Sequence, residues 1–498
     1  MADIQKAFNL HNEGKLNEAE KIYMEFLEEN PKQPDVSNLL GLIYLQKKQL
    51  EKAEHCFIDA VMGFPCAEFY QNLGLVYYNK KDYPKSMECF SKAINFEKNN
   101  VDFIRNFAKM AKQSGQTEYA IDFYKKSLEI EPDDEVGLNN LGLLYEQLHD
   151  YKQAKTLYQQ SLKVRKNFEA LHNLGVLYRT ERNFDESIKC LSNALKLKPS
   201  NNETMISLGM SYLSKKDLKN GFKYYKYMKP EIRAKYKNPW NGDKHTESTI
   251  LVFYYAGYGD HIMFSRYLPF LKDYFKEIKL LVPPSLRSIF AQNFPFVKIV
   301  EADEKDYDFS ASIMELHFLM RIDFEHIPFA SGYLKSDIEI EQKYKKEYFQ
   351  TNKKKIGLFW QGNPKVFPNR SIKLKELSKL FDLNDYEFFS FEKDDKHNQI
   401  NDFPNLKDLG ATFKNFSDTA GALKNLDILI TIDSSIAHLS GALGVKTYLL
   451  LPYGSEWRWF KDEETTPWYD SIRIFKQKQH WDWTPVVLDI FDVLKNSD

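Results

Sequence analysis

A unit of 33 or 34 residues recurs through the first 230 residues of this 498-residue chain. Each unit carries a glycine or alanine, usually a second small residue twelve positions later, and a large residue four positions after that. The first small residue recurs at Gly41, Gly74, Ala108, Gly142, Gly175 and Gly209. Because small residues let two helices approach and residues four positions apart share a helix face, each unit is predicted to be a helical hairpin. Such hairpins bury their apolar faces only by stacking on their neighbours.

This pattern resembles the tetratricopeptide repeat, in about seven copies over residues 1–230. Tyrosine three residues after most of the glycines and proline near the ends of several units strengthen the resemblance. It implies an N-terminal α-solenoid with a concave groove. The large residues of the pattern are interpreted as core.

A column of asparagines lies two residues before the small residue in four of the units. These are Asn72, Asn106, Asn140 and Asn173. A carboxamide both donates and accepts, so the column is predicted to bind the backbone of an extended acceptor peptide. The repeat array of O-GlcNAc transferases looks similar and grips peptides in this way. The alternative is a purely structural column, since asparagine is common at this position in ordinary tetratricopeptide repeats.

The remaining residues follow a different pattern. Residues 231–249 lack helical or strand periodicity and are interpreted as a linker. Residues 250–350 and 351–498 each alternate short apolar strands with helix-like segments. This alternation favours two Rossmann-like domains with parallel sheets, so the predicted fold class is α + α/β.

The first strand of residues 250–350 ends in a glycine-rich turn, Ala256-Gly257-Tyr258-Gly259-Asp260. A helix is expected to begin near His261. Because glycines allow a ligand to approach the backbone closely, Gly257 and Gly259 are predicted to contact a ligand. Asp260 is expected at the start of the helix, above the sheet.

The segment 426–459 is predicted to form a strand, a polar loop, a small-residue helix and a second strand. The loop, Asp433-Ser434-Ser435, lies at the N-terminus of the helix. Free N–H groups and the helix dipole favour anions there, so a phosphate-bearing ligand is predicted. The alternative is that these residues are ordinary N-caps.

Motifs in both α/β domains resemble bacterial glycosyltransferases. GYGDHIMFSRYLP is similar to the SxGDxxxxxP segment of ADP-heptose-dependent heptosyltransferases, and IDSSIAHLSGALG to their DTGxxHLxAALG segment. Together with the repeats, PWNG, WQGNP, FSDTA, EWRW and TPWY, these motifs resemble repeat-fused, heptosyltransferase-like proteins, including the FlmG-type flagellin glycosyltransferases. The sequence departs from the pattern at Ser434-Ser435, Tyr258 and His261, which leaves the donor open.

The resemblance implies a GT-B glycosyltransferase with the acceptor on the first α/β domain and the nucleotide-sugar on the second. It assigns Gly257 and Gly259 to acceptor binding. Asp260 matches the family's catalytic base, its alternative role being the N-cap of the following helix. Donor binding is assigned to Trp360, Gly362, Asn363, Arg370, Lys393, Asp433, Ser434, Ser435 and His438. The implied function is transfer of a sugar to Ser or Thr of a protein recruited by the repeats, with flagellin suggested by the resemblance.

Composition argues against several classes of protein. Lys plus Arg number 69 and Asp plus Glu 70, which argues against a nucleic-acid-binding protein. The four cysteines lack metal-site spacing, and we interpret the Asp306-Tyr307-Asp308 match to a metal-binding DxD motif as a turn. We therefore expect no metal and no cofactor beyond the donor substrate. Without a recognisable signal peptide or membrane span, a cytoplasmic protein is expected.

Two alternatives remain open from the sequence. In one, the chain is a repeat scaffold whose α/β half binds nucleotides without catalysis. In the other, the enzyme acts on a saccharide acceptor and the repeats serve assembly.

Overall fold

The computed structural model describes residues 3–225, 229–322, 327–362, 370–393, 399–453, 457–459, 464–479 and 481–496. Two compact units divide the chain. The first comprises Met1–Tyr178 with Lys189–Pro199, and the second comprises Arg179–Ile188 with Ser200–Asp498.

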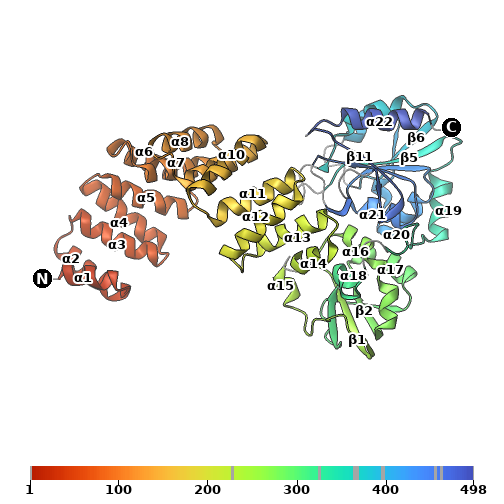
Figure 1. The fold of residues 1–498 in the computed structure, drawn as a ribbon, viewed down its shortest axis with the longest axis horizontal. Coiled ribbons are helices and arrows are strands. Elements are labelled where there is room, and N and C mark those ends of the chain that lie inside the picture. The colour runs from red at the N-terminus through yellow and green to blue at the C-terminus, as the bar shows by residue number, and fades with distance from the viewer. Residues whose placement is uncertain are drawn as a thin grey trace. The chain divides into compact units, whose positions relative to one another are not determined.

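Paired helices fill the described chain up to residue 225 (Figure 1). They are α1 (Ile4–Asn12), α2 (Leu16–Glu29), α3 (Pro34–Gln46), α4 (Leu50–Gly63), α5 (Ala67–Asn79), α6 (Tyr83–Phe96), α7 (Val101–Gln113), α8 (Thr117–Ile130), α9 (Glu135–Gln147), α10 (Tyr151–Val164), α11 (Phe168–Thr180), α12 (Phe184–Leu197), α13 (Asn202–Ser214) and α14 (Leu218–Tyr225). These fourteen helices make seven hairpins among the described residues, as the repeat count predicts.

The turn inside each hairpin passes through a residue with positive φ. These residues are Gly14, Lys48, Lys81, Gly115, His149, Arg182 and Lys216. They lie 33 or 34 residues apart, so the turns repeat with the period seen in the sequence.

The small and large residues of the pattern meet inside the hairpins. A Cβ atom added to Gly41 would lie 2.7 Å from the Phe57 ring, and one added to Gly142 would lie 2.7 Å from the Tyr158 ring. Both rings are fully buried. Because the glycine of the first helix has no side chain, it leaves room for the large residue of the second helix.

Gly142→Val is expected to destabilise the first unit by about 1–3 kcal/mol, because overpacking forces neighbours out of place. The Tyr158 ring cannot move away freely, since its hydroxyl donates to Glu146 Oε2 at 2.7 Å. The midpoint of thermal unfolding followed by far-UV circular dichroism should fall by several degrees. The unfolding transition followed by tryptophan fluorescence should not change, since all seven tryptophans lie in Ser200–Asp498.

Gly115→Asn is the control, because no atom lies within 4 Å of a Cβ at Gly115 and asparagine tolerates its φ of +78°. An unchanged midpoint in Gly142→Val would contradict the packing argument.

The second unit contains a four-stranded parallel sheet with the strand order β3-β2-β1-β4. Its strands are β1 (His245–Phe253), β2 (Phe275–Leu281), β3 (Val297–Val300) and β4 (Phe309–Ser312). Its helices are α15 (Pro230–Arg233), α16 (Tyr258–Ser265), α17 (Arg287–Asn293) and α18 (Leu316–Leu319), with short 3-10 helices at Leu268–Asp273, Pro284–Leu286 and Ile313–Glu315. The sequence placed the start of α16 near His261, whereas the helix begins at Tyr258 with Gly257 as its N-cap.

A second sheet of the same unit has the order β10-β11-β9-β8-β5-β6-β7 and is parallel except between β10 and β11. Its strands are β5 (Lys354–Phe359), β6 (Tyr386–Ser390), β7 (Leu406–Asp408), β8 (Ile428–Ile432), β9 (Thr447–Leu451), β10 (Thr465–Thr466) and β11 (Tyr469–Lys476). Its helices are α19 (Ile338–Glu347), α20 (Phe416–Leu423), α21 (Ser435–Ala442) and α22 (Thr484–Lys495), with 3-10 helices at Leu374–Asp382, Gln399–Asp402, Gly410–Thr412 and Trp457–Trp459.

The last hairpin, α13 and α14, packs into the core of the second unit. Leu213, Leu218 and Phe222 belong to the same buried cluster as Phe264 and Trp457. The Phe222 ring makes edge-on contacts with Phe264 at 6.0 Å and with Trp457 at 5.8 Å. The repeats thus continue into the unit that holds the two sheets.

A fully buried arginine, Arg266, joins the parts of the second unit that carry the two sheets. Its Nε donates to Met263 O at 2.9 Å and its Nη1 to Trp468 O at 2.9 Å. The guanidinium also lies over the rings of Tyr333 and Tyr469, at 4.7 and 4.8 Å. Carbonyl oxygens and aromatic faces, rather than a carboxylate, therefore hold this charge.

Among the described helices, none has the length and apolarity needed to cross a membrane.

Candidate active site

Each sheet has one point at which its strand order reverses. In the first sheet the chain runs from β1 to β2 and β3 on one side and then crosses to β4 on the other. In the second sheet it runs from β5 to β6 and β7 and then crosses to β8. Ligands of open α/β sheets bind outside the carboxyl ends of the strands at such switch points. The loop after β1 leads into α16, and the loop after β8 leads into α21.

The two switch-point loops contact each other. A Cβ atom added to Gly259 would lie 2.6 Å from His438 Cδ2 and 3.5 Å from Ser435 Cα. Figure 1 shows α16 beside α21. A side chain at position 259 would therefore separate the two helices, which explains why glycine is needed there. Gly259, which the sequence assigned to acceptor binding, therefore also has a packing role. A Cβ at Gly257, by contrast, would meet no atom within 4 Å.

Asp260 lies in the first turn of α16 and is almost buried, with 8% of its surface exposed. The alternative role as an N-cap is wrong, because Gly257 occupies that position and Asp260 makes no capping bond. Asp260 Oδ1 instead accepts from Arg458 Nε at 2.8 Å and Nη2 at 2.6 Å. Its Oδ2 accepts no hydrogen bond within the described part of the chain. Arg458 thus orients the carboxylate through one of its two oxygens.

The loop after β8 is tied to the loop after β5. Arg370 Nη1 donates to Asp433 O at 3.0 Å and lies 4.0 Å from Asp433 Oδ2. A Cβ at Gly362 would lie 2.9 Å from Arg370 Cδ, so this glycine makes room for the arginine. Ser434 caps α21 through a hydroxyl that accepts from Ala437 N, as the alternative interpretation predicted. Ser435 is the first residue of the helix.

His438 lies between these groups and is 97% buried. Its Nδ1 bonds the Tyr469 hydroxyl at 3.1 Å, and its ring stacks on Trp459 at 4.9 Å. Burial lowers the pKa of His438 to about 4, although the charges of Asp433 and Asp260 act in the opposite direction. The imidazole is therefore neutral at pH 7, and its contribution to a phosphate site is a hydrogen bond rather than a positive charge.

Two described donor candidates, Trp360 and Lys393, do not join this cluster. Trp360 is fully buried in the core of the second sheet, so its ring cannot stack on a nucleotide base, and this assignment is wrong. Lys393 is exposed after β6 and has no side-chain contact with the cluster among the described residues. Asn363 lies outside the described residues.

A cavity of about 920 Å³ opens where β5 ends. The lining includes Gln361 and Gly362, the exposed ring of Trp481, Phe403 and the cation Lys373. The Gln361 backbone is fixed by its N–H donating to Glu392 Oε2 at 3.1 Å. Aromatic rings, amides and a cation next to a switch point suit a nucleotide.

The DxD-like segment is structural. Asp306 pairs with Lys279 at 3.0 Å, and Asp308 Oδ2 accepts from Thr249 N at 2.8 Å. Within the described ranges, no group of three His, Cys, Asp or Glu side chains is placed to hold a metal ion.

The asparagine column in the first unit divides into two kinds. Asn72 Nδ2 donates to Asn38 Oδ1 at 2.8 Å, and Asn173 Nδ2 donates to Asn139 Oδ1 at 2.9 Å. These bonds tie neighbouring hairpins together. Asn106 and Asn140 are half-buried, and their side chains form no hydrogen bond in the portion of the chain described. Among the described residues of the column, Asn106 and Asn140 therefore have the whole carboxamide open to a peptide backbone.

Arg458 is a residue of this site that the sequence analysis did not single out. Its neighbours Trp457 and Trp459 are buried, with 2% and 0% of their surfaces exposed. A cation between two buried tryptophans was the available signal, because a charge in such a place requires a partner.

Comparison with known protein families confirms the repeats in the N-terminal part of the chain. The tetratricopeptide repeat family matches residues 34–62, 67–100, 106–134, 123–156 and 168–201. The N-terminal part of the chain is a tetratricopeptide-repeat array.

Two curated proteins are similar over part of their length. The uncharacterized protein ycf37 of Pyropia yezoensis is 42% identical over 55 residues, which are 11% of this chain and 31% of that protein. N-alpha-acetyltransferase 16, NatA auxiliary subunit, of Homo sapiens is 27% identical over 150 residues, which are 30% of this chain and 14% of that protein. The chain therefore spans less than a third of either relative.

Two solved structures are similar to this chain to a limited extent. The C-terminal part of a repeat-containing protein from Cytophaga hutchinsonii has 12% identity and a TM-score of 0.40, and the match covers 46% of this chain and 96% of that one. The anaphase-promoting complex hetero-tetramer Cut9-Hcn1 has 18% identity and a TM-score of 0.38, covering 44% of each chain.

Proposed function

We propose that the chain is a metal-independent GT-B glycosyltransferase. In this proposal it moves a sugar from a nucleotide-sugar to Ser or Thr of a protein held by the repeats. The observation that carries the proposal is the contact between the two switch-point loops, which brings the Asp260 carboxylate beside the N-terminus of α21. The motif resemblance of the two loops supports the same assignment.

Asp260 Oδ2 would take the proton of the acceptor hydroxyl, and the oxygen would attack the anomeric carbon of the sugar. The bond between that carbon and the donor phosphate breaks, and the nucleotide leaves with the bonding electrons. The N–H groups in the first turn of α21 and the guanidinium of Arg370 would stabilise the departing phosphate. The cavity beside Gly362 would hold the nucleoside.

A direct test uses the purified full chain with UDP-, GDP-, ADP- and CMP-activated sugars. One donor should release nucleotide, and flagellin is the first acceptor to examine for a gain of one sugar on Ser or Thr by mass spectrometry. The scaffold alternative predicts nucleotide binding without release. Failure of every donor to release nucleotide, with a protein partner still bound, would overturn the proposal.

The open amides of the repeat array provide a test of the acceptor. Asn106→Ala with Asn140→Ala in one chain should raise the KM for the protein acceptor about thirtyfold, since each of the two lost hydrogen bonds is worth about 1 kcal/mol. The turnover number and the donor KM should not change. Asn72→Ala is the comparison, because Asn72 bonds Asn38 and its loss should lower stability rather than acceptor affinity.

A saccharide acceptor gives a different result in the same assay. Transfer to a soluble saccharide would be unaffected by Asn106→Ala with Asn140→Ala, and no protein would gain mass. The kind of acceptor is therefore decided by which transfer the double variant impairs.

A further inference from the structure

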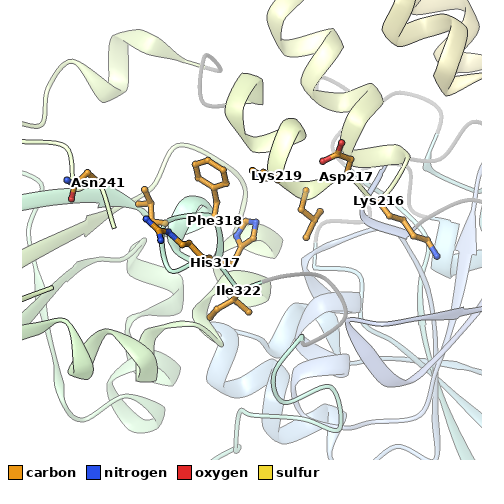
Figure 2. A pocket seen from close by; sticks show the side chains of 10 residues that line it. Lys216, Asp217, Lys219, Asn241, His317, Phe318 and Ile322 are labelled. Carbon is orange, nitrogen blue, oxygen red and sulfur yellow. The ribbon is translucent and has the colours of Figure 1, made fainter. Parts of the chain in front are cut away.

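A second cavity, of about 820 Å³, lies between the last helical hairpin and α18 within the second unit (Figure 2). It is lined by Lys216, Asp217, Leu218, Lys219, Asn241, His317, Phe318, Leu319, Arg321 and Ile322. None of these residues belongs to the cluster around Asp260.

The linker forms a fixed wall of this cavity. Gly242, with a φ of +98°, packs so closely on α18 that an added Cβ would lie 2.4 Å from Leu319 O. The Trp240 indole donates to Asp243 O at 2.7 Å and packs edge-on against Phe275 at 5.2 Å. The segment that carries Asn241 is therefore held in place, and the cavity does not depend on a loose loop.

His317 lies at the floor, with 1% of its surface exposed. Figure 2 shows its ring beside Phe318, with Asn241 on one side and Lys216 on the other. Phe222 packs against the ring at 4.2 Å, and neither ring nitrogen makes a hydrogen bond of ordinary geometry within the described residues. Burial lowers the pKa of His317 to about 3, although the nearby Met314 backbone acts in the opposite direction. A neutral imidazole offers one donor and one acceptor, and leaving them unpaired costs about 1–3 kcal/mol.

Positive charge dominates the rim. Lys216, Lys219 and Arg321 are exposed around the opening. The one carboxylate, Asp217, is occupied as a cap, since it accepts from Asn220 N at 3.0 Å and from Asn220 Nδ2 at 2.7 Å. The side chains between rim and floor are apolar: Leu218, Phe318, Leu319 and Ile322.

We propose that this cavity binds a small anionic carbohydrate, either a sugar phosphate or a sugar acid. A sugar hydroxyl hydrogen-bonds one unpaired nitrogen of His317, and the face of the sugar ring packs on Phe318. The phosphate or carboxylate lies beside Lys219 and Arg321. The volume falls within the range of ligand sites, about 300–1,000 Å³. The site is separate from the proposed donor cavity and holds independently of the proposed function.

Calorimetric titration of the full chain tests this with four probes: glucose 6-phosphate, glucuronate, glucose and inorganic phosphate. Glucose 6-phosphate or glucuronate should bind at least about tenfold more tightly than both glucose and inorganic phosphate. Which of the two anionic sugars binds better decides between a phosphate and a carboxylate. Equal binding of inorganic phosphate and the anionic sugars, or no binding of either sugar, would overturn the proposal.

Variants locate the binding. Lys219→Ala with Arg321→Ala should weaken the anionic sugar about tenfold or more, whereas Lys305→Ala, an exposed lysine outside the cavity, should not change the affinity. His317→Phe keeps an aromatic ring in the Phe222 contact and should remove the preference over inorganic phosphate. Undiminished sugar binding in both the double variant and His317→Phe would place the ligand elsewhere and reject the site.

Discussion

Asp260→Asn is expected to lower the rate of sugar transfer by about 10²–10⁴-fold, the range that a general base contributes. Asparagine has the same shape, and its side-chain oxygen can still accept from Arg458, which now bonds Oδ1 at 2.6 and 2.8 Å. It cannot take a proton from an acceptor hydroxyl. The kcat should therefore fall while the KM for the nucleotide-sugar remains nearly the same. The measurement is steady-state release of nucleotide in the presence of the acceptor.

Two further variants separate catalysis from positioning. Arg458→Lys keeps the charge but loses the paired N–H groups, so it should reduce kcat less than Asp260→Asn does. Glu301→Gln removes an exposed carboxylate that pairs with Arg287 at 2.6 Å, and it should leave transfer unaffected. Full activity of Asp260→Asn would mean that another group takes the proton.

The repeat array was predictable because its signal is local and repeated. The small residue at Gly142 and the large residue at Tyr158 are 16 positions apart, and the structure brings them into contact. A hairpin needs no information from distant residues, so its periodicity alone determines the fold. The number of hairpins follows from the same spacing.

The site was predicted only in part, because it depends on contacts between distant segments. The motifs located Asp260 and the loop at Ser434, which lie on helices that begin directly after strands. They did not show that Arg458, 198 positions from Asp260, supplies its ion-pair partner. Trp360 follows a strand like a ligand residue, yet its ring turns into the core. Strand order, which periodicity does not reveal, decides which loops meet.

Acidification is expected to unfold the second unit through three buried histidines. Burial lowers the pKa of His261 to about 4, that of His317 to about 3 and that of His438 to about 4. An unfolded histidine titrates near 6.5, so between about pH 6.5 and pH 4 the unfolded state binds more protons than the folded state. The stability from these neutral imidazoles is complete above pH 6.5 and is lost as the pH falls through that range.

The expected loss of folding stability is large enough to measure. A shift of one pKa unit corresponds to about 1.4 kcal/mol, so His438 alone contributes about 3 kcal/mol. Three such groups together rival the whole net stability of a domain, about 5–15 kcal/mol. Tryptophan fluorescence measures the unfolding of the second unit alone, because all seven tryptophans lie there. The urea midpoint should fall steeply from pH 7 to pH 4.5.

His317→Phe tests whether protonation of a buried histidine causes the loss of stability in acid. The ring lies against Phe222 at 4.2 Å and near Phe264 at 5.4 Å, so phenylalanine fits the same apolar surroundings without a group that can charge. The variant should be at least as stable as the parent at pH 7, because it also removes two unpaired buried nitrogens, and it should lose less stability on acidification, by about 1–3 kcal/mol at pH 4.5. A slope unchanged by His317→Phe would assign the acid sensitivity to other groups. Because this substitution also removes the hydrogen-bonding floor of the cavity beside α18, the same protein shows whether acid stability and sugar binding depend on one imidazole.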